Sequence, residues 1–168
     1  MDEKRLNEAM EGIPQAWACA LIGEIDFAIE MLNRSLEVVD EFFMEQKLDL
    51  DGIFKYLEGL KLRGDLYQKK GDFEGYFNAS NSYATATGIY RALREQGRLP
   101  EEDKRQYFLL LAKRARMYRK HDNPQAALES YAEIFNGMTK DEISEYADRM
   151  DELDELVQRT WGESKEGA

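Results

Sequence analysis

The sequence predicts an all-α protein, and three observations support this fold class. Apolar residues recur at intervals of three and four along nearly every segment of the 168-residue chain, and no stretch keeps a strict alternation of apolar and polar residues. The chain contains only 3 prolines, and the breaks between periodic segments are short. We therefore expect about seven helices, with consecutive helices packed as antiparallel neighbours.

The N-terminal part should contain an interrupted helix followed by a long one. We expect an interruption at Gly12 and Pro14, because a proline inside a helix removes a backbone hydrogen bond, unless Pro14 starts a new turn that leads into Trp17 and Leu21. Gly23 predicts a bend. The apolar spacing after it predicts an amphipathic helix over residues 24–47.

The middle of the chain carries clear start and stop signals for two further helices. Asp49 and Asp51 can cap the first of them, and the Lys-Lys-Gly sequence at residues 69–71 should end it. Asp72 can cap the second, which should occupy residues 73–97.

Three helices are expected in the last part of the chain. Pro100, followed by three acidic residues, predicts the start of a helix over residues 101–121. Asn123 can cap the next helix, which Gly137 should end. Residues 139–161 begin with capping-box spacing and form an apolar stripe that needs a partner to cover it.

The length and the cysteine content indicate the domain organisation and the compartment. A chain of this size can bury a core without a metal or a disulfide, so we expect one domain over residues 1–161 and a disordered tail at residues 162–168. The only cysteine, Cys19, is expected to be a buried structural thiol. The apolar run around it is too short to span a membrane, so we expect a cytoplasmic protein that makes no membrane contact.

Positive and negative charges are segregated along the chain, whose net charge is −11. Residues 1–60 hold 5 basic and 14 acidic side chains, residues 61–121 hold 14 and 7, and residues 122–168 hold 4 and 13. The acidic total disfavours general binding to nucleic acid or to anionic membranes. The basic middle segment predicts a local surface for an acidic partner.

No set of residues predicts a reaction. His121 is the only histidine, and we expect it to be exposed at a helix end. One histidine and one cysteine exclude histidine-rich zinc or di-iron sites and thiolate clusters, and glycine-rich phosphate loops are absent. The acidic residues between 148 and 155 are expected to form a solvated face. We therefore predict a protein that is not an enzyme and has no metal or cofactor.

The segment Leu60–Glu74 combines Gly64, Tyr67 and a Gly-Asp turn at residues 71–72. In this combination it resembles the first helix and turn of a tetratricopeptide repeat, where a small residue, a tyrosine three positions later and a Gly-Asp turn bring two helices into close packing. Ala115 matches the same small position in a second hairpin.

The resemblance extends over residues 15–138 and implies an array of helical hairpins, with residues 139–161 as a capping helix. In the second hairpin Tyr118 takes the role of Tyr67, at a separation of 51 residues, whereas the usual period of the family is about 34. A secondary resemblance is to the 14-3-3 proteins, and the residues that carry it are Tyr56, Leu57, Lys61, Gly64, Asp65 and Tyr67.

The tetratricopeptide resemblance implies a concave groove lined by the first helix of each hairpin. The candidate peptide-binding cations on this groove are Lys61, Lys69, Lys113, Arg116, Arg119 and Lys120. Members of that family with basic grooves clamp acidic peptide ends. We therefore predict a non-enzymatic protein-interaction or adaptor module that binds an acidic or carboxylate-terminated peptide.

Three alternatives remain open. The cations could only neutralise acidic helices of the same chain, where exposed ion pairs contribute little stability. The protein could be a self-associating structural subunit, a homo-oligomer that uses exposed apolar residues of its first or last helix. Tyrosines interleaved with cations also occur in single-strand nucleic-acid binders, but the acidic flanks argue against that reading.

Overall fold

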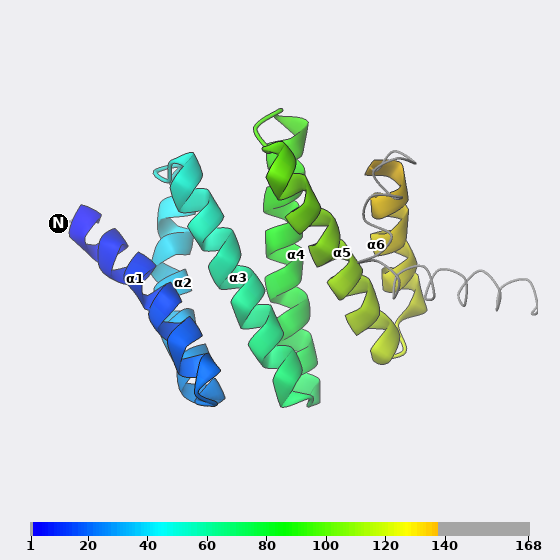
Figure 1. Cartoon of the computed structure of the whole chain (residues 1–168), viewed down its shortest axis with the longest axis horizontal. Coiled ribbons are helices and arrows are strands. Elements are labelled where there is room, and N and C mark those ends of the chain that lie inside the picture. The colour runs from blue at the N-terminus through cyan, green and yellow to red at the C-terminus, as the bar shows by residue number, and fades with distance from the viewer. Residues whose placement is uncertain (1, 138–168) are drawn as a thin grey trace, which may run out of the picture. The chain divides into compact units, whose positions relative to one another are not determined.

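Helices account for all the regular structure in the part of the chain that the structure, a computed structural model, describes, residues 2–137. Six helices and no strand occur in this range (Figure 1). The all-α prediction is therefore confirmed, whereas the expected seventh helix at residues 139–161 and the tail at residues 162–168 lie outside the described residues.

The chain divides into two compact units, an N-terminal unit of residues 1–100 and a C-terminal unit of residues 101–168. The expectation of one domain over residues 1–161 stays a prediction. None of the helices within residues 2–137 combines the length and the hydropathy that a membrane crossing requires.

The N-terminal unit consists of two helical hairpins that pack side by side (Figure 1). Its helices are α1 (Asp2–Leu21), α2 (Ile25–Met44), α3 (Leu50–Lys70) and α4 (Phe73–Glu95). α1 pairs with α2 and α3 pairs with α4, while α2 also packs against α3. The apolar faces of these helices form the core of the unit, where Leu32, Leu57 and Tyr83 have no exposed surface.

Two of the predicted helix caps of the N-terminal unit, Asp49 and Asp72, are confirmed, whereas Asp51 lies inside the first turn of α3 and does not cap it. The side chain of Asp49 accepts a hydrogen bond of 2.7 Å from the backbone N–H of Gly52, and that of Asp72 accepts one of 2.6 Å from Gly75. Gly23 and Gly71 have the positive φ angles, 87° and 71°, that a left-handed turn after a helix requires. The connections are therefore as short as the sequence predicts.

α1 is continuous, so the predicted interruption at Gly12 and Pro14 is wrong. Gly12 faces α2 so closely that an added Cβ would lie 2.0 Å from Ser35 Oγ. Together with Ile13 and Ala16 it forms a buried stripe on α2, and packing of this stripe outweighs the hydrogen bond that Pro14 removes.

The lone thiol also differs from its prediction. Cys19 is half-buried, and its Sγ lies 3.8 Å from Sδ of Met31 on α2.

In the second hairpin, α3 approaches α4 at a glycine. A Cβ added at Gly64 would lie 2.4 Å from the ring of Tyr83, which is fully buried. The hydroxyl of Tyr83 donates a 2.5 Å hydrogen bond to Asp65 Oδ1 and accepts one of 3.3 Å from Gln68. Tyr83 is thus fixed between the two helices at both its ring and its hydroxyl.

The described part of the C-terminal unit is a third hairpin, made of α5 (Glu101–Lys120) and α6 (Pro124–Gly137). Tyr107, Leu111 and Ile134 are buried in it. Asn123 accepts a 3.3 Å hydrogen bond from the backbone N–H of Ala126, as its predicted capping role requires. His121 directly follows α5 and is half-buried, less exposed than predicted.

Candidate functional site

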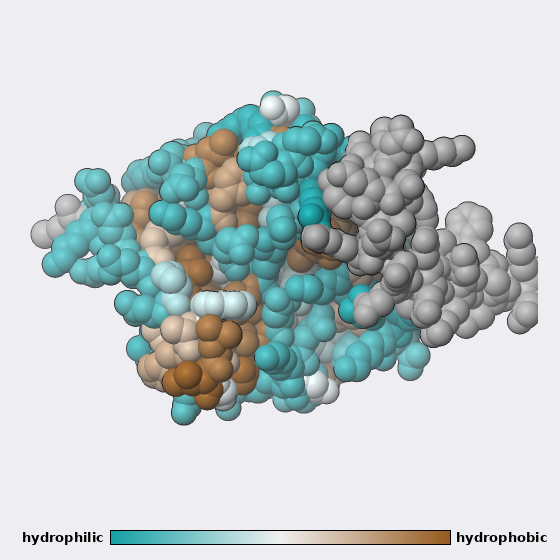
Figure 2. All heavy atoms as spheres, viewed as in Figure 1, coloured by the Kyte–Doolittle hydropathy of each residue, from teal (hydrophilic) through white to brown (hydrophobic). Residues whose placement is uncertain are grey.

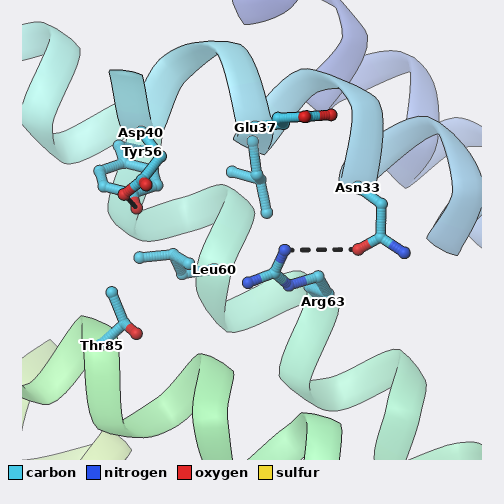
Figure 3. A pocket seen from close by; sticks show the side chains of 8 residues that line it. Asn33, Glu37, Asp40, Tyr56, Leu60, Arg63 and Thr85 are labelled. Carbon is cyan, nitrogen blue, oxygen red and sulfur yellow. Dashed lines mark hydrogen bonds between the residues drawn. The ribbon is translucent and has the colours of Figure 1, made fainter. Parts of the chain in front are cut away.

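A cavity of about 230 Å³ opens in the N-terminal unit between α2, α3 and α4 (Figure 3). It is lined by Asn33, Leu36, Glu37 and Asp40 from α2, by Tyr56, Leu60 and Arg63 from α3, and by Thr85 from α4. Apart from the adjacent pair Leu36 and Glu37, the lining residues on α2 and on α3 follow one another at three or four positions, which places each set on one face of its helix.

Arg63 is the only cation among the lining residues, and neutral groups hold it in place. Its Nε donates a hydrogen bond of 3.0 Å to Ser82 Oγ on α4, and its Nη1 donates one of 3.3 Å to Asn33 Oδ1 on α2 (Figure 3). Within residues 2–137 it forms no ion pair with a carboxylate. The side chain is therefore a partly desolvated charge without an ionic partner.

Burial lowers the pKa of the Arg63 guanidinium, and the hydroxyls of Tyr67 and Tyr56 and the carboxylate of Asp40 act in the opposite direction. An arginine remains charged in spite of such a shift. A guanidinium carries five N–H donors, of which Ser82 and Asn33 use two, so about three remain for a ligand.

The amide of Asn33 is oriented by a second hydrogen bond. Its Nδ2 donates to the hydroxyl of Tyr67 on α3 at 3.1 Å, which leaves Oδ1 directed at Arg63. One network of hydrogen bonds thus connects three helices through Tyr67, Asn33, Arg63 and Ser82. This network holds the guanidinium in one orientation.

A tyrosine–carboxylate pair lines another part of the cavity. The hydroxyl of Tyr56 donates a 2.6 Å hydrogen bond to Asp40 Oδ1, and burial, followed by the interaction with Asp40, raises the pKa of Tyr56. Tyr56 is therefore a donor at neutral pH and occupies one oxygen of Asp40. Glu37 is exposed at the cavity (Figure 3).

Of the cations predicted for a peptide groove, two belong to the N-terminal unit. Lys61 is packed into the α3–α4 hairpin: its Nζ lies 2.5 Å from Glu58 Oε1, donates to the Tyr90 hydroxyl at 3.1 Å and leaves the side chain only 13% exposed. Lys69 is exposed near the end of α3. Lys61 therefore contributes to packing, and Lys69 lies on the surface.

The other four predicted cations, Lys113, Arg116, Arg119 and Lys120, lie on α5 in the C-terminal unit. Arg119 is half-buried and the other three are exposed. The structure therefore distributes the six predicted residues over two units, and their common groove stays a prediction.

Tyr131, on α6, is buried next to this cluster. Burial raises the pKa of Tyr131 to about 12, against the opposing charges of Arg119 and Arg116. Among residues 2–137 its hydroxyl has no hydrogen-bond partner.

The residues that make the cavity were not predicted as a site. In the sequence Arg63 is only one cation of the basic middle segment, because it lies between Leu60 and Leu66 on an amphipathic helix, where a polar residue is normally solvated. The spacing of Tyr56, Leu60 and Arg63 was the available signal. Asn33 and Asp40 gave no sequence signal for a cavity, since isolated polar residues on a long amphipathic helix are normally solvated.

Within residues 2–137 no cluster of three or more histidine, cysteine, aspartate or glutamate side chains is arranged to hold a metal ion. No protein-family model, no curated protein and no solved structure matches the chain.

Proposed function

We propose that the protein is a non-enzymatic interaction or adaptor module, built as a tetratricopeptide-like array of helical hairpins, and that it binds an acidic or carboxylate-terminated peptide. In this proposal the cavity between α2, α3 and α4 receives the carboxylate. The observation that carries the proposal is the partly buried guanidinium of Arg63, which neutral hydrogen-bond partners hold in place.

Carboxylates are the ligands that fit such a group best. Two parallel hydrogen bonds from one guanidinium to the two oxygens of a carboxylate are short and directional, and Arg63 retains enough N–H donors to form them. Because Asn33 and Ser82 already hold the side chain, little side-chain entropy is lost on binding.

Glu37 and Asp40 set a limit on the ligand. Their charges oppose an additional anion, although Tyr56 partly satisfies Asp40. A single carboxylate joined to peptide amide groups suits this cavity better than a run of acidic residues or a phosphate, because amide N–H groups can donate to the oxygens of Glu37 and Asp40.

Peptide binding tests the proposal. We expect fluorescently labelled peptides with a free C-terminal carboxylate or one internal acidic residue to bind more tightly than their amidated or neutral counterparts. Arg63→Gln should weaken that binding by about ten- to a hundredfold, the usual effect of losing hydrogen bonds to a charged group. Arg63→Lys, which keeps the charge and loses the fork, should also weaken it.

Arg34→Gln is the matched control, because Arg34 lies on the same helix as Asn33 but pairs with Glu30 on the surface. It should leave peptide affinity unchanged. Circular dichroism and thermal melting of each variant establish that it is folded. Equal affinity of Arg63→Gln and the unaltered chain for all peptides would show that the cavity is not the carboxylate site.

The cations of α5 are tested separately within this proposal. Replacing Arg116 and Arg119 together with glutamate should remove acidic partners in a pull-down if α5 contributes to binding. Unchanged partners with unchanged folding would restrict the interaction to the N-terminal unit.

A further inference from the structure

The cavity between α2, α3 and α4 carries opposite charges at its two ends. The guanidinium of Arg63, bonded to Asn33, lies at one end, and the carboxylate of Asp40, bonded to Tyr56, lies at the other (Figure 3). Asn33 and Asp40 are seven residues apart on α2, and so are Tyr56 and Arg63 on α3. Seven residues form about two turns of helix, so the two ends are about 10 Å apart along the helices.

The two carboxylates of the lining, Glu37 and Asp40, retain oxygens for a ligand. Asp40 accepts the Tyr56 hydroxyl through Oδ1, and within residues 2–137 nothing donates to its second oxygen. Glu37, one turn before Asp40 on α2, forms no hydrogen bond or ion pair with any residue of that range. Both side chains are exposed. The lining therefore holds two negative charges and one positive charge, and a cation on the ligand would be the first to pair with either carboxylate.

The cavity is small and offers little apolar surface. Its volume of about 230 Å³ lies below the roughly 300 to 1,000 Å³ of common ligand pockets, so it suits one terminal residue better than a longer stretch of peptide. Leu36 and Leu60, its aliphatic lining residues, are buried. The large exposed apolar side chains of the unit lie elsewhere, for example where α1 ends and α2 begins, and Figure 2 shows brown surface there. Selection of a ligand by the cavity therefore depends on charge and hydrogen bonds.

We propose that Glu37 and Asp40 select a peptide whose last residue is lysine or arginine, with its terminal carboxylate on Arg63 and its side-chain cation on the two carboxylates. Selection of this kind rests on the proposed function, because Arg63 must first bind the terminal carboxylate. Every charge of the lining then faces an opposite charge of the ligand. Complementary charges of this type determine specificity more than they determine affinity.

The spacing of charges in a basic C-terminal residue fits the spacing in the cavity. In lysine, six bonds join the carboxyl carbon to the side-chain nitrogen, which is about 7 Å when the chain is extended. The reach of the Arg63 and Asp40 side chains covers the remainder of the distance between the two ends. An α-ammonium group is only two bonds from the carboxyl carbon, so it is too close to span the cavity. A neutral last residue would leave Glu37 and Asp40 facing the carboxylate of the ligand, and an acidic one would add a further repulsion.

Fluorescently labelled peptides of one sequence that differ only at the C-terminus test the proposal on the full chain. Three end in a free carboxylate, on lysine, norleucine or glutamate, and a fourth ends in lysine amide. Norleucine has nearly the lysine stem and lacks the ammonium group. The lysine acid should bind about five- to tenfold more tightly than the norleucine acid, an effect between those of an exposed ion pair and of a hydrogen bond to a buried charge. The glutamate acid should bind most weakly. Equal affinities of the lysine and norleucine acids would overturn the proposal.

The double variant Glu37→Gln, Asp40→Asn removes both negative charges and keeps the shape of the lining, since the substituted amide at position 40 still accepts from Tyr56. It should bind the lysine acid more weakly than the unaltered chain does. It should bind the norleucine acid more tightly, because the repulsion of the terminal carboxylate is gone. These opposite changes cannot come from a loss of folding. Equal weakening for both peptides would mean that the two carboxylates only support the fold, and would overturn the proposal.

Glu30→Gln with Glu41→Gln is the matched control, because it changes the net charge by the same amount on the same helix. Both residues are exposed and pair outside the cavity, Glu30 with Arg34 and Glu41 with Arg5. The control should keep the preference for the lysine acid over the norleucine acid. If it lost that preference as the double variant of the cavity does, the preference would come from the acidic charge of the whole chain, and the proposal would be wrong.

The same peptides separate failure of this proposal from failure of the proposed function. If Arg63→Gln weakens binding of the norleucine acid but lysine gives no advantage over norleucine, the carboxylate site stands and only the selection by Glu37 and Asp40 is overturned. If the lysine amide binds as tightly as the lysine acid, or if none of the peptides binds, both proposals fail. Free lysine places an additional α-ammonium group next to Arg63, so it should compete with the lysine acid only weakly. Equal competition would assign the cavity to a free amino acid and overturn the peptide.

Discussion

At the scale of single residues, the absence of a side chain at Gly64 allows α3 to approach α4. The ring of Tyr83 occupies the space where a Cβ would lie, at 2.4 Å, and hydrogen bonds to Asp65 and Gln68 hold its hydroxyl. The ring therefore cannot move away without losing those bonds. A glycine here is required for packing, since its backbone lies within a regular helix.

We predict that Gly64→Ala lowers the free energy of unfolding by about 1 to 3 kcal/mol, the usual cost of overpacking a core. Gly88→Ala provides the comparison within the same hairpin, because nothing lies within 4 Å of a Cβ added there. It should raise stability by about 0.5 to 1 kcal/mol through helix propensity alone. Urea denaturation measures the free energy of unfolding of both variants. A higher value for Gly64→Ala than for the unaltered chain would mean that the Tyr83 ring shifts to make room for the added methyl group.

Single residues also show which features of the structure the sequence does not predict. Gly64 was recognised as a small position through its spacing from Tyr67 and the following turn, which are local features. The environment of Arg63 depends on Asn33 and Ser82, residues 30 positions before it and 19 after it. No local pattern connects these three, so whether an arginine is solvated or held in a cavity follows only from how the helices pack.

At the scale of helices, the ends of several helices were predictable from the sequence, whereas the continuity of α1 through Pro14 was not. Asp49, Asp72 and Asn123 cap helices as expected, because a cap needs only a side-chain oxygen three residues before a backbone N–H. The continuity of α1 through Pro14 depends on tertiary packing of its buried face against α2, which local propensity does not contain.

Pro14 therefore weakens a helix that persists in spite of it. We predict that Pro14→Ala raises the free energy of unfolding by about 1 to 3 kcal/mol, because it restores a hydrogen bond within α1 and removes a ring that crowds the preceding turn. Pro124, the first residue of α6, is the control. Its N–H would have no partner within the helix and its φ is already suitable, so Pro124→Ala should change stability by less than about 0.5 kcal/mol.

Chemical denaturation of the two variants distinguishes these effects. A destabilised Pro14→Ala chain would indicate that the proline ring itself makes contacts that α1 needs.

At the scale of the whole molecule, the segregation of charge along the chain was visible in the sequence, but its spatial result was not. The basic segment 61–121 crosses from the N-terminal unit into the C-terminal unit, and within it Lys61 pairs with Glu58 and packs on Tyr90. Counting charges along the chain cannot tell such a buried contact from a surface cation. The helices could be predicted because their sequence signals are periodic. The cavity could not be predicted, since its residues come from three different helices.

Both units contain buried tyrosines, and this predicts how the whole molecule responds to alkali. Burial raises the pKa of Tyr83, with the charge of Asp65 acting in the same direction, and burial raises that of Tyr131 to about 12. In the unfolded chain a tyrosine loses its proton near pH 10. Above that pH the unfolded state binds fewer protons than the folded state, so the stability that these groups contribute is complete below pH 10 and is lost as the pH rises further.

We predict that the free energy of unfolding falls steeply above about pH 10, by up to about 1.4 kcal/mol per pH unit for each tyrosine that remains protonated in the fold. Tyr83→Phe should be less stable than the unaltered chain at pH 8, because it loses the bond to Asp65, but should show a shallower decline above pH 10. Thr87→Val, which removes a buried hydroxyl without a titratable proton from the same helix, should keep the original slope. Urea denaturation at several pH values between 8 and 11 decides this, and parallel curves for Tyr83→Phe and the unaltered chain would mean that another group causes the alkaline transition.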